Sequence, residues 1–241
     1  MNEAGEVKNK ILKASIGLFS QKGYEAASVG EIAKTAGVTK ALIYYYFKNK
    51  EDILDSLVRS LLGKVTALTM DFVNSNIIKM IKSGILDIKP DRLSFAREED
   101  AAVFLEKGYE YFEKLLGFVL KNRALIRILM SESLKTGKNR NGLFDFMNLA
   151  TRLDDNPIFK TVSDADSDFC YSADMVMFKF FYELFPLINF AVYYDDYKAA
   201  SGLSDGELRY AFIRLFKIVP SSLLAGKDIM LRPKPCGDTM P

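Results

Sequence analysis

Residues 28–50 read SVGEIAKTAGVTKALIYYYFKNK, and this stretch decides the fold of the N-terminal part of the chain. Ser28 with Glu31 three positions later fits a capping box, in which hydroxyl and carboxylate each accept a backbone amide proton at a helix start. Gly37 can adopt the left-handed conformation that ends a helix, and Thr39 is a good N-cap for a second one. Two short helices joined by a tight turn are therefore predicted, over about residues 28–36 and 39–46.

Apolar residues recur at helical spacing, so each predicted helix has an inward and an outward side. The first helix places Val29, Ile32, Ala33 and Ala36 on one face. In the second helix the inward residues are Leu42, Ile43 and Phe47, whereas Lys40, Tyr44 and Lys48 recur every four residues on another side. Such a pair is typical of a helix-turn-helix, whose second helix enters the major groove of DNA. A third helix start is expected at Asn49, followed by Lys50, Glu51 and Asp52.

In order and spacing, 21 positions across residues 7–54 resemble the TetR/AcrR family of bacterial transcriptional repressors. The matching residues are Ile11, Leu12, Ala14, Leu18, Phe19, Gly23, Tyr24, Ser28, Val29, Ile32, Ala33, Ala36, Gly37, Val38, Thr39, Ile43, Tyr44, Tyr46, Phe47, Lys50 and Glu51. The resemblance implies an all-α protein: an N-terminal three-helix DNA-binding domain joined to a larger helical bundle for ligand binding and dimerisation. One departure is Ala41, where family members usually carry glycine; its methyl group could touch a thymine methyl or limit how closely the backbone approaches a phosphate.

The residues expected to contact DNA follow from these positions. Thr39, Lys40, Ala41 and Tyr45 are predicted to face base edges, with Lys40 as a guanine reader. Phosphate contacts are predicted for three further side chains: Ser28, Tyr44 and Lys50. Double-stranded DNA with a palindromic operator is the expected partner, because a dimer reads two half-sites about 34–36 Å apart.

Charge and composition agree with a cytoplasmic protein that binds DNA at one end. The 241-residue chain has a net charge of +2 and 49% hydrophobic residues. Residues 1–50 hold eight lysines and four glutamates, a net +4, which leaves −2 for the rest. The N-terminus lacks the apolar stretch of a signal peptide, and charges interrupt the apolar segment 169–194. Cys170 and Cys236 form no metal or CxxC motif, so no metal or cofactor is expected.

Helices are predicted for most of the remaining chain, without an internal repeat and without strands. The expected helices cover about residues 5–22, 49–75, 77–83, 97–121, 143–153, 157–163, 165–196 and 204–224, with a loop at 87–91. A further helix is expected after Asn122, with apolar residues from Leu125 to Leu134. Asn122 is expected to cap the helix that follows it, and Pro186 to bend or interrupt the helix that contains it. The predicted domains are residues 1–50 for DNA binding, 51–231 for effector binding and dimerisation, and a disordered tail at 232–241.

The aromatic and methionine content of the C-terminal part permits two interpretations. The chain has 18 Phe, 12 Tyr and 9 Met, and these can simply fill a helical core. Alternatively, some line a cavity for an apolar or aromatic effector. The candidates are Phe104, Tyr111, Phe112, Leu115, Met130, Met147, Tyr171, Met175, Phe178 and Tyr182. Glu132, within an apolar run, is either a surface group or a buried carboxylate that selects a cationic or hydroxylated ligand.

The last two long helices are apolar around most of their circumference, which suits deep core or an interface. The family resemblance favours a homodimer through these two helices. An enzyme is not expected, because the chain has no histidine and no glycine-rich phosphate loop. Two alternatives stay open: a C-terminal domain that binds a protein rather than a small molecule, and an activator instead of a repressor.

Overall fold

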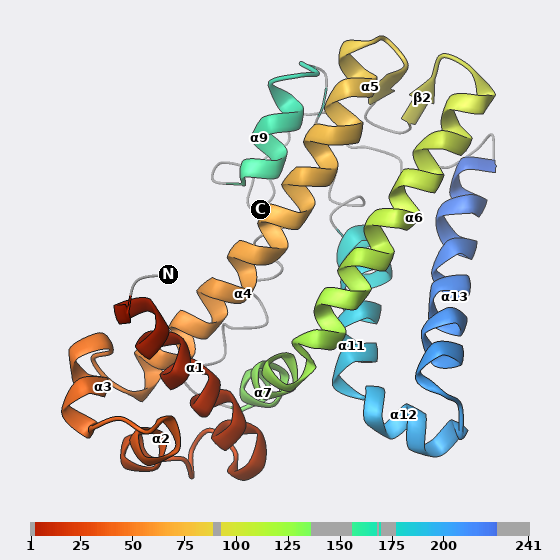
Figure 1. Cartoon of the computed structure of the whole chain (residues 1–241). Coiled ribbons are helices and arrows are strands. Elements are labelled where there is room, and N and C mark those ends of the chain that lie inside the picture. Colours follow the sequence, from red (N-terminus) through yellow and green to blue (C-terminus); the bar gives the residue numbers. More distant parts are fainter. Residues whose placement is uncertain (1–2, 89–92, 136–155, 168, 170–176, 226–241) are drawn as a thin grey trace. The chain divides into compact units, whose positions relative to one another are not determined.

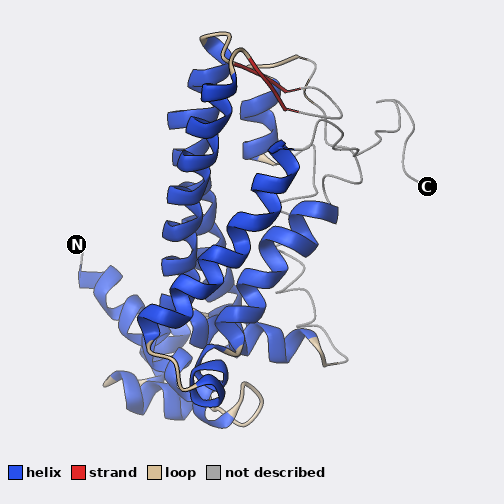
Figure 2. Ribbon diagram, turned by 90° about the vertical axis from the view of Figure 1, so that its right-hand side faces the viewer, coloured by secondary structure: helices blue, strands red, loops and turns tan. Residues whose placement is uncertain are grey.

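The computed structural model describes residues 3–88, 93–135, 156–167, 169 and 177–225, with side chains omitted for Glu3 and 219–225. Within these residues the chain is helical apart from one short hairpin (Figures 1 and 2). Two compact units are formed, one within residues 1–64 and 121–146 and the other within residues 65–120 and 147–241. The all-α prediction is therefore confirmed, and each unit can be described by itself.

The first unit is built on three N-terminal helices and the start of a fourth. These are α1 (Glu3–Lys22), α2 (Val29–Ala36), α3 (Lys40–Tyr46) and α4 (Lys50–Phe72), close to the predicted ranges. Their apolar faces meet in a core whose members are at most 2% exposed: Ile11, Phe19, Ile32, Ile43, Phe47 and Ile53. Because these positions follow the helical period, the sequence pattern alone places them in the core.

A later helix, α7 (Arg123–Ser133), also belongs to the first unit, where it packs against α1. Leu125, Ile126, Ile128 and Leu129 are buried. The helix begins where predicted, directly after Asn122, but no capping hydrogen bond comes from the Asn122 side chain. The association with α1 joins segments about a hundred residues apart, so local sequence patterns could not reveal it.

After α4, the helical path continues through one π-helical turn, η1 (Val73–Ile77), into α5 (Ile78–Lys82). Two side chains bond backward to carbonyls at this point: the Asn74 amide donates to Met70 O at 2.9 Å and the Asn76 amide to Phe72 O at 3.0 Å. Side chains that compete for helix carbonyls favour local widening of the turn. The two predicted helices are thus one continuous path with a π turn between them.

The prediction of no strands was wrong, and Asp87 and Ile88 at the start of the predicted loop lie in a strand, whereas the rest of that loop, residues 89–91, lies outside the described residues. Strands β1 (Leu86–Ile88) and β2 (Leu93–Phe95) form an antiparallel pair, with Leu86 opposite Phe95 and Ile88 opposite Leu93. Leu86 and Ile88 are buried in a cluster with residues from η1, α5 and α9, and the Asp166 carboxylate accepts the Ile88 amide proton at 3.1 Å. Three-residue strands are too short to show a two-residue alternation, so tertiary packing decides this element.

The hairpin leads into α6 (Glu98–Lys121). Further along the chain, α9 (Pro157–Ser163) begins with Pro157 in its first turn and ends where predicted. The Asn156 side chain caps α9 by accepting amide protons from Ile158 and Phe159. Proline suits the first turn because its missing N–H has no helical partner there.

The predicted helix at 165–196 is only partly correct. Residues 165–167 and 169 are not helical, and the described helical path starts at Met177. It runs through the π-helical segment η3 (Lys179–Leu184) into α11 (Phe185–Val192), then turns at Tyr193 into α12 (Tyr194–Ser201). Pro186 lies in the first turn of α11, two residues after the end of η3, as expected of a residue that cannot donate the helical hydrogen bond. The last helix, α13 (Asp205–Ala225), runs alongside α6 in Figure 1.

Among the described helices, none combines the length and the apolar content that a membrane crossing requires. The predicted helix at 143–153, the tail from residue 232, Cys170 and Cys236 lie outside the described residues.

Candidate nucleic-acid interface

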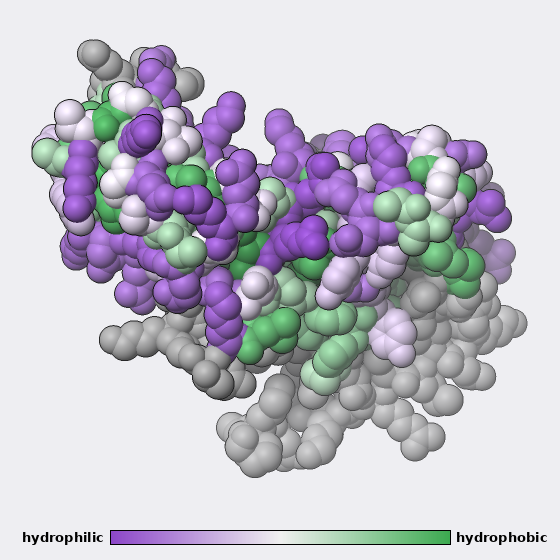
Figure 3. All heavy atoms as spheres, turned by 90° about the horizontal axis from the view of Figure 1, so that it is seen from below, coloured by the Kyte–Doolittle hydropathy of each residue, from purple (hydrophilic) through white to green (hydrophobic). Residues whose placement is uncertain are grey.

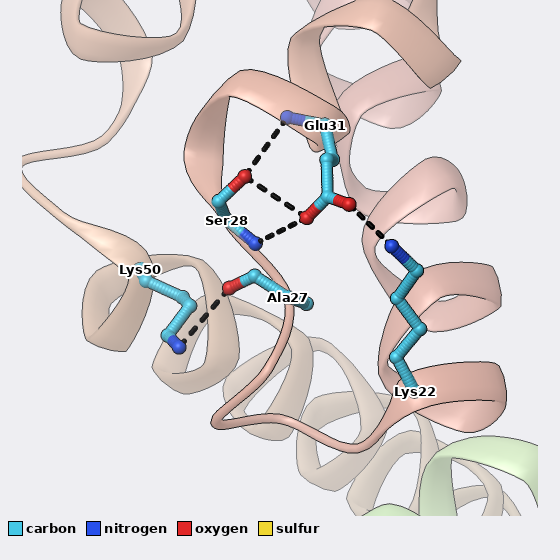
Figure 4. Close-up of polar contacts among 5 residues, drawn as sticks. All are labelled: Lys22, Ala27, Ser28, Glu31 and Lys50. Atoms are coloured by element: carbon cyan, nitrogen blue, oxygen red, sulfur yellow. Dashed lines mark hydrogen bonds and ion pairs between the residues drawn. The ribbon is translucent and has the colours of Figure 1, made fainter.

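The start of α2 is fixed by the capping box that the sequence predicts. The Glu31 amide donates to Ser28 Oγ at 3.2 Å, and the Ser28 amide and hydroxyl donate to Glu31 Oε2 at 3.0 and 2.9 Å (Figure 4). The other oxygen of Glu31 pairs with Lys22 Nζ at the end of α1. Chiefly the Lys22 hydrogen bond, with help from Ser28, lowers the pKa of Glu31 from its ordinary 4.5 to about 2. This carboxylate thus joins α1 to α2.

The turn between α2 and α3 also follows the predicted chemistry. Gly37 has φ 67° and ψ 35°, the left-handed conformation that few residues other than glycine adopt. The Val38 amide then bonds to Ala33 O at 3.0 Å, which closes the end of α2. Thr39 caps α3 by accepting the Leu42 amide proton at 3.2 Å. The turn residues therefore set where α3 begins and which way it points.

Helix α3 has a buried side that packs into the domain and an exposed side that is accessible to a partner. Ile43 is 1% exposed and anchors the helix, whereas Tyr44 is 51% and Tyr45 80% exposed. Thr39, Lys40 and Ala41 are also exposed. Lys40 Nζ lies 5.9 Å from the centre of the Tyr44 ring, one helical turn further on. The predicted base-reading residues therefore share the exposed first turns of one short helix. Seen from below, most of the surface of the first unit is hydrophilic (Figure 3).

Lys50, which we expected to hold a phosphate, is used inside the unit. Its ammonium group donates to the carbonyls of Tyr24, Glu25 and Ala27 at 2.8, 3.0 and 3.1 Å. Figure 4 shows the contact with Ala27. The ammonium group also lies 4.5 Å from the centre of the Tyr24 ring. An ammonium has three donors, so a phosphate could bind Lys50 only by displacing a carbonyl. The predicted phosphate contact of Lys50 would therefore compete with these carbonyls, and it stays a prediction.

The cap of α4 lies beside Lys50 and agrees with the prediction at Asn49. Asn49 Oδ1 accepts the Asp52 amide proton at 2.8 Å, and Asp52 Oδ2 accepts the Lys48 amide proton at 3.0 Å. The carboxylate also suits the positive end of the helix dipole.

A tight turn, two capped helices and an outward-facing second helix define a helix-turn-helix DNA-binding domain. Comparison with known proteins agrees with this: residues 11–57 match the family model of bacterial regulatory proteins of the tetR family. This stretch of the chain therefore resembles the DNA-binding domain of that family.

Curated relatives support this resemblance over the same stretch. The transcriptional regulator AcrR of Shigella flexneri is 47% identical over 55 residues, which are 23% of this chain and 26% of AcrR. A fatty acid metabolism regulator protein of Bacillus subtilis is 46% identical over 55 residues, 23% of this chain and 28% of that protein. The matches thus span about a quarter of each relative's length.

Solved structures extend the likeness to the whole fold. A TetR-family transcriptional regulator from Syntrophomonas wolfei matches with a TM-score of 0.59 at 18% identity, covering 94% of this chain and 98% of its own. The fatty acid degradation regulator FadR from Bacillus halodurans matches with a TM-score of 0.52 at 20% identity, covering 95% and 97%. At these identities, the likeness concerns the fold alone.

The predicted effector residues divide between several surroundings. Phe112 is 3% exposed and stacks with Phe212 and Phe216, and Leu115 is 9% exposed, so both pack as core. The ring centres of Phe104 and of Phe95 in the hairpin lie 5.4 Å apart. Phe178 stacks with Tyr182 at 5.3 Å, and Tyr182 is 59% exposed. These contacts agree better with core and surface roles than with the walls of one shared site.

Tyr111 is the predicted effector residue with the most specific contacts. Its hydroxyl forms a 2.8 Å hydrogen bond with Thr69 Oγ1, and its ring stacks on Phe72 at 4.6 Å. Burial raises the pKa of Tyr111, so its hydroxyl stays protonated. Tyr111 therefore fastens α6 to the second half of α4.

The remaining predicted effector residues are not brought together with these. Met130 lies on α7 in the first unit, and Met147, Tyr171 and Met175 lie outside the described residues. Glu132, also on α7, is 4% exposed and forms an ion pair with Lys135. It is the buried carboxylate of our two alternatives, but Lys135 already neutralises it, so a cationic ligand has no unpaired charge to bind there.

Sequence reasoning missed several residues that position the site. Lys22, which pairs with Glu31, and Thr69, which bonds Tyr111, carry no local signal, since their partners lie on other helices. The Tyr24 ring packs edge-on against Phe19 at 5.1 Å and beneath Lys50. Tyr24 is among the residues that match the family pattern, but its contact with Lys50 was not predicted.

Proposed function

We propose that this protein is a ligand-responsive, site-specific transcriptional regulator that acts in the cytoplasm as a homodimer. Specifically, it represses transcription by binding a palindromic operator, and a small apolar or aromatic effector releases it. The resemblance to the TetR family supports the DNA-binding part; the operator symmetry, the repression and the effector are our proposals.

The exposed side of α3 carries the proposal. Tyr45 exposes four-fifths of its surface, and Thr39, Lys40 and Ala41 lie beside it on a helix anchored by buried Ile43. Tyr44, next to Tyr45, is 51% exposed, and two neighbouring exposed aromatic residues on an otherwise well-packed domain suit a contact surface. We propose that Tyr45 and its neighbours Thr39, Lys40 and Ala41 face base edges, with Lys40 donating to guanine. Tyr44 and Ser28 are proposed to contact phosphates, Ser28 while it also caps α2.

Dimerisation is proposed to involve the last helical segments. Met177, Phe181 and Phe185 recur every four residues and are 50%, 49% and 37% exposed. On α13, Tyr210, Leu215 and Ile218 are 64%, 66% and 60% exposed. Apolar side chains this exposed on two successive segments favour an interface over a solvated surface. A dimer also supplies the second α3 that a palindromic operator needs.

Release by an effector is proposed to act through α4. This single helix begins at the caps beside the helix-turn-helix and ends at Phe72, which stacks on Tyr111 of α6. An effector that prefers one arrangement of α6 and α4 would shift the population of protomers whose α3 helices fit the operator. A coupling of about 1–3 kcal/mol, roughly 5–150-fold in affinity, would suffice.

The test is fluorescence anisotropy of the purified protein on DNA from directly upstream of its own gene, against scrambled DNA of equal length, across a salt series. We expect saturable binding to the upstream DNA with at least about 10³-fold preference. Equal, weak and steeply salt-dependent binding to both DNAs would contradict site-specific autoregulation. The same assay then serves to screen apolar and aromatic compounds for release.

A further inference from the structure

The ammonium group of Lys50 occupies a site formed by the loop between α1 and α2. Three carbonyl oxygens, from Tyr24, Glu25 and Ala27, accept its three protons at 2.8–3.1 Å. The Tyr24 ring lies under the same charge at 4.5 Å, a distance suited to a cation–π contact. Carbonyl oxygens and an aromatic face together replace the water that a surface lysine would keep.

Without these contacts, the charge of Lys50 would lie at an unfavourable position. Lys50 is the first residue of α4, where the helix dipole is positive and a cation is disfavoured. Three carbonyl dipoles aimed at the ammonium group offset that repulsion. The contact partners are themselves fixed: Tyr24 is 5% and Ala27 2% exposed, and Tyr24 packs against Phe19 of α1. Lys50 therefore connects the first turn of α4 to a rigid part of the domain.

The loop that Lys50 holds leads directly into the recognition elements. Ala27 precedes Ser28, the N-cap of α2, and the same cap includes Glu31 and its Lys22 pair (Figure 4). If the first turn of α4 is displaced, the start of α2 should therefore move with it.

We propose that Lys50 is a positioning residue that fastens α4 to the α1–α2 loop, so that the helix-turn-helix follows α4 as one body, and that it does not bind a DNA phosphate. The proposal rests on the proposed function, because it concerns how movement of α4 reaches α3. In this proposal, Lys50 transmits a movement of α4, the helix proposed to respond to the effector, to α3, the helix proposed to read DNA bases.

The salt dependence of DNA binding separates the two roles of Lys50. A lysine that neutralises a phosphate contributes about 0.9 to the slope of log K against log salt, and its loss weakens all sequences alike. For Lys50→Met, we expect an unchanged salt slope on both DNAs, with affinity for the upstream DNA reduced at least about 10-fold and affinity for scrambled DNA within about 2-fold. A slope reduced by roughly 1 per protomer, with both DNAs weakened equally, would overturn the proposal.

Lys48→Met is the matched control, since Lys48 is an exposed lysine two positions earlier. It removes the same charge near the same helix start without removing the three carbonyl contacts. We expect Lys48→Met to keep the preference for upstream over scrambled DNA. If it lowers that preference as much as Lys50→Met does, general charge near α4 explains the effect and the positioning role is wrong.

A measurement without DNA keeps the test independent of the proposed function. In NMR spectra of the ¹⁵N-lysine-labelled full chain, the Lys50 ammonium signal, assigned by its loss in Lys50→Met, should exchange with water far more slowly than those of the other lysines. Exchange as fast as that of Lys48 would overturn the proposal. If the wild-type protein does not prefer the upstream DNA, the proposed function fails, while this spectrum still decides whether Lys50 is held by the loop.

Discussion

The two units use their aromatic side chains in different ways. In the first unit, buried and exposed side chains are sharply separated: Ile43 is 1% exposed and Tyr45, two residues later, is 80% exposed. In the second unit, some aromatic residues pack on one another, as Phe112 does with Phe212 and Phe216, and others are exposed, as Tyr210 is at 64%. Exposed aromatic residues on the small capped domain agree with the contact surface that we propose, whereas aromatic content in a helical bundle does not by itself identify a binding site.

The largest expected effect tests whether Phe112 is core or a wall of an effector site. Phe112→Ala should lower the free energy of unfolding by about 3–5 kcal/mol, because a buried stacked ring is replaced by a cavity. The paired variant Tyr45→Ala should change it by no more than about 0.5 kcal/mol. Urea denaturation followed by circular dichroism measures both. A Phe112→Ala cost below about 1 kcal/mol would indicate that the ring borders open space, and the contrast between the units would fail.

A second prediction tests the exposed apolar residues of the last helix. Leu215→Glu should weaken dimerisation roughly 5–150-fold, because a charge would be buried at the proposed interface at a cost of about 1–3 kcal/mol. Sedimentation equilibrium over a concentration series gives the dissociation constant. Lys114→Glu, an exposed change on α6, is the control for added negative charge. If Leu215→Glu leaves the association unchanged, α13 does not form the interface.

How far sequence predicts this molecule depends on the distance between interacting residues. The capping box, the glycine turn and the Thr39 cap act within five residues, and the helix-turn-helix they specify is confirmed. The hairpin at Leu86–Phe95, the packing of α7 on α1 and the carbonyl site of Lys50 depend on tertiary packing, with partners up to more than 100 positions away. No periodicity encodes such contacts, which is why the sequence predicted neither the strands nor the carbonyl partners of Lys50.

The Ser28 cap should have a smaller, local effect on stability. Ser28→Ala removes the acceptor for the Glu31 amide and is expected to cost about 1 kcal/mol. Hydrogen exchange followed by mass spectrometry should show faster exchange across α2, with α6 unchanged as the internal reference. Equal acceleration in both helices would mean that the cap stabilises more than α2. Ser28→Asp, which can still accept that proton, should restore slow exchange.

The smallest effect concerns pH and the link from α1 to α2. Since folding lowers the pKa of Glu31 from 4.5 to about 2, the ionised carboxylate stabilises the fold above pH 4.5, and this contribution disappears as pH falls toward 2. Glu31→Gln should therefore melt a few degrees below wild type at pH 7, with a difference that shrinks between pH 4.5 and 2. Thermal melts at matched ionic strength measure this. A difference that stays constant down to pH 2 would contradict the role of the charge.

The central claim, that the exposed side of α3 reads bases while its buried side only supports it, is tested most directly by the preference for upstream over scrambled DNA in Lys40→Met and Tyr45→Ala. Fluorescence anisotropy at fixed salt gives both affinities for each variant. We predict a preference lowered roughly 5–150-fold, on the scale of about 1–3 kcal/mol for a lost base contact, with an unchanged melting temperature. A preference equal to that of the wild type in both variants would contradict the account.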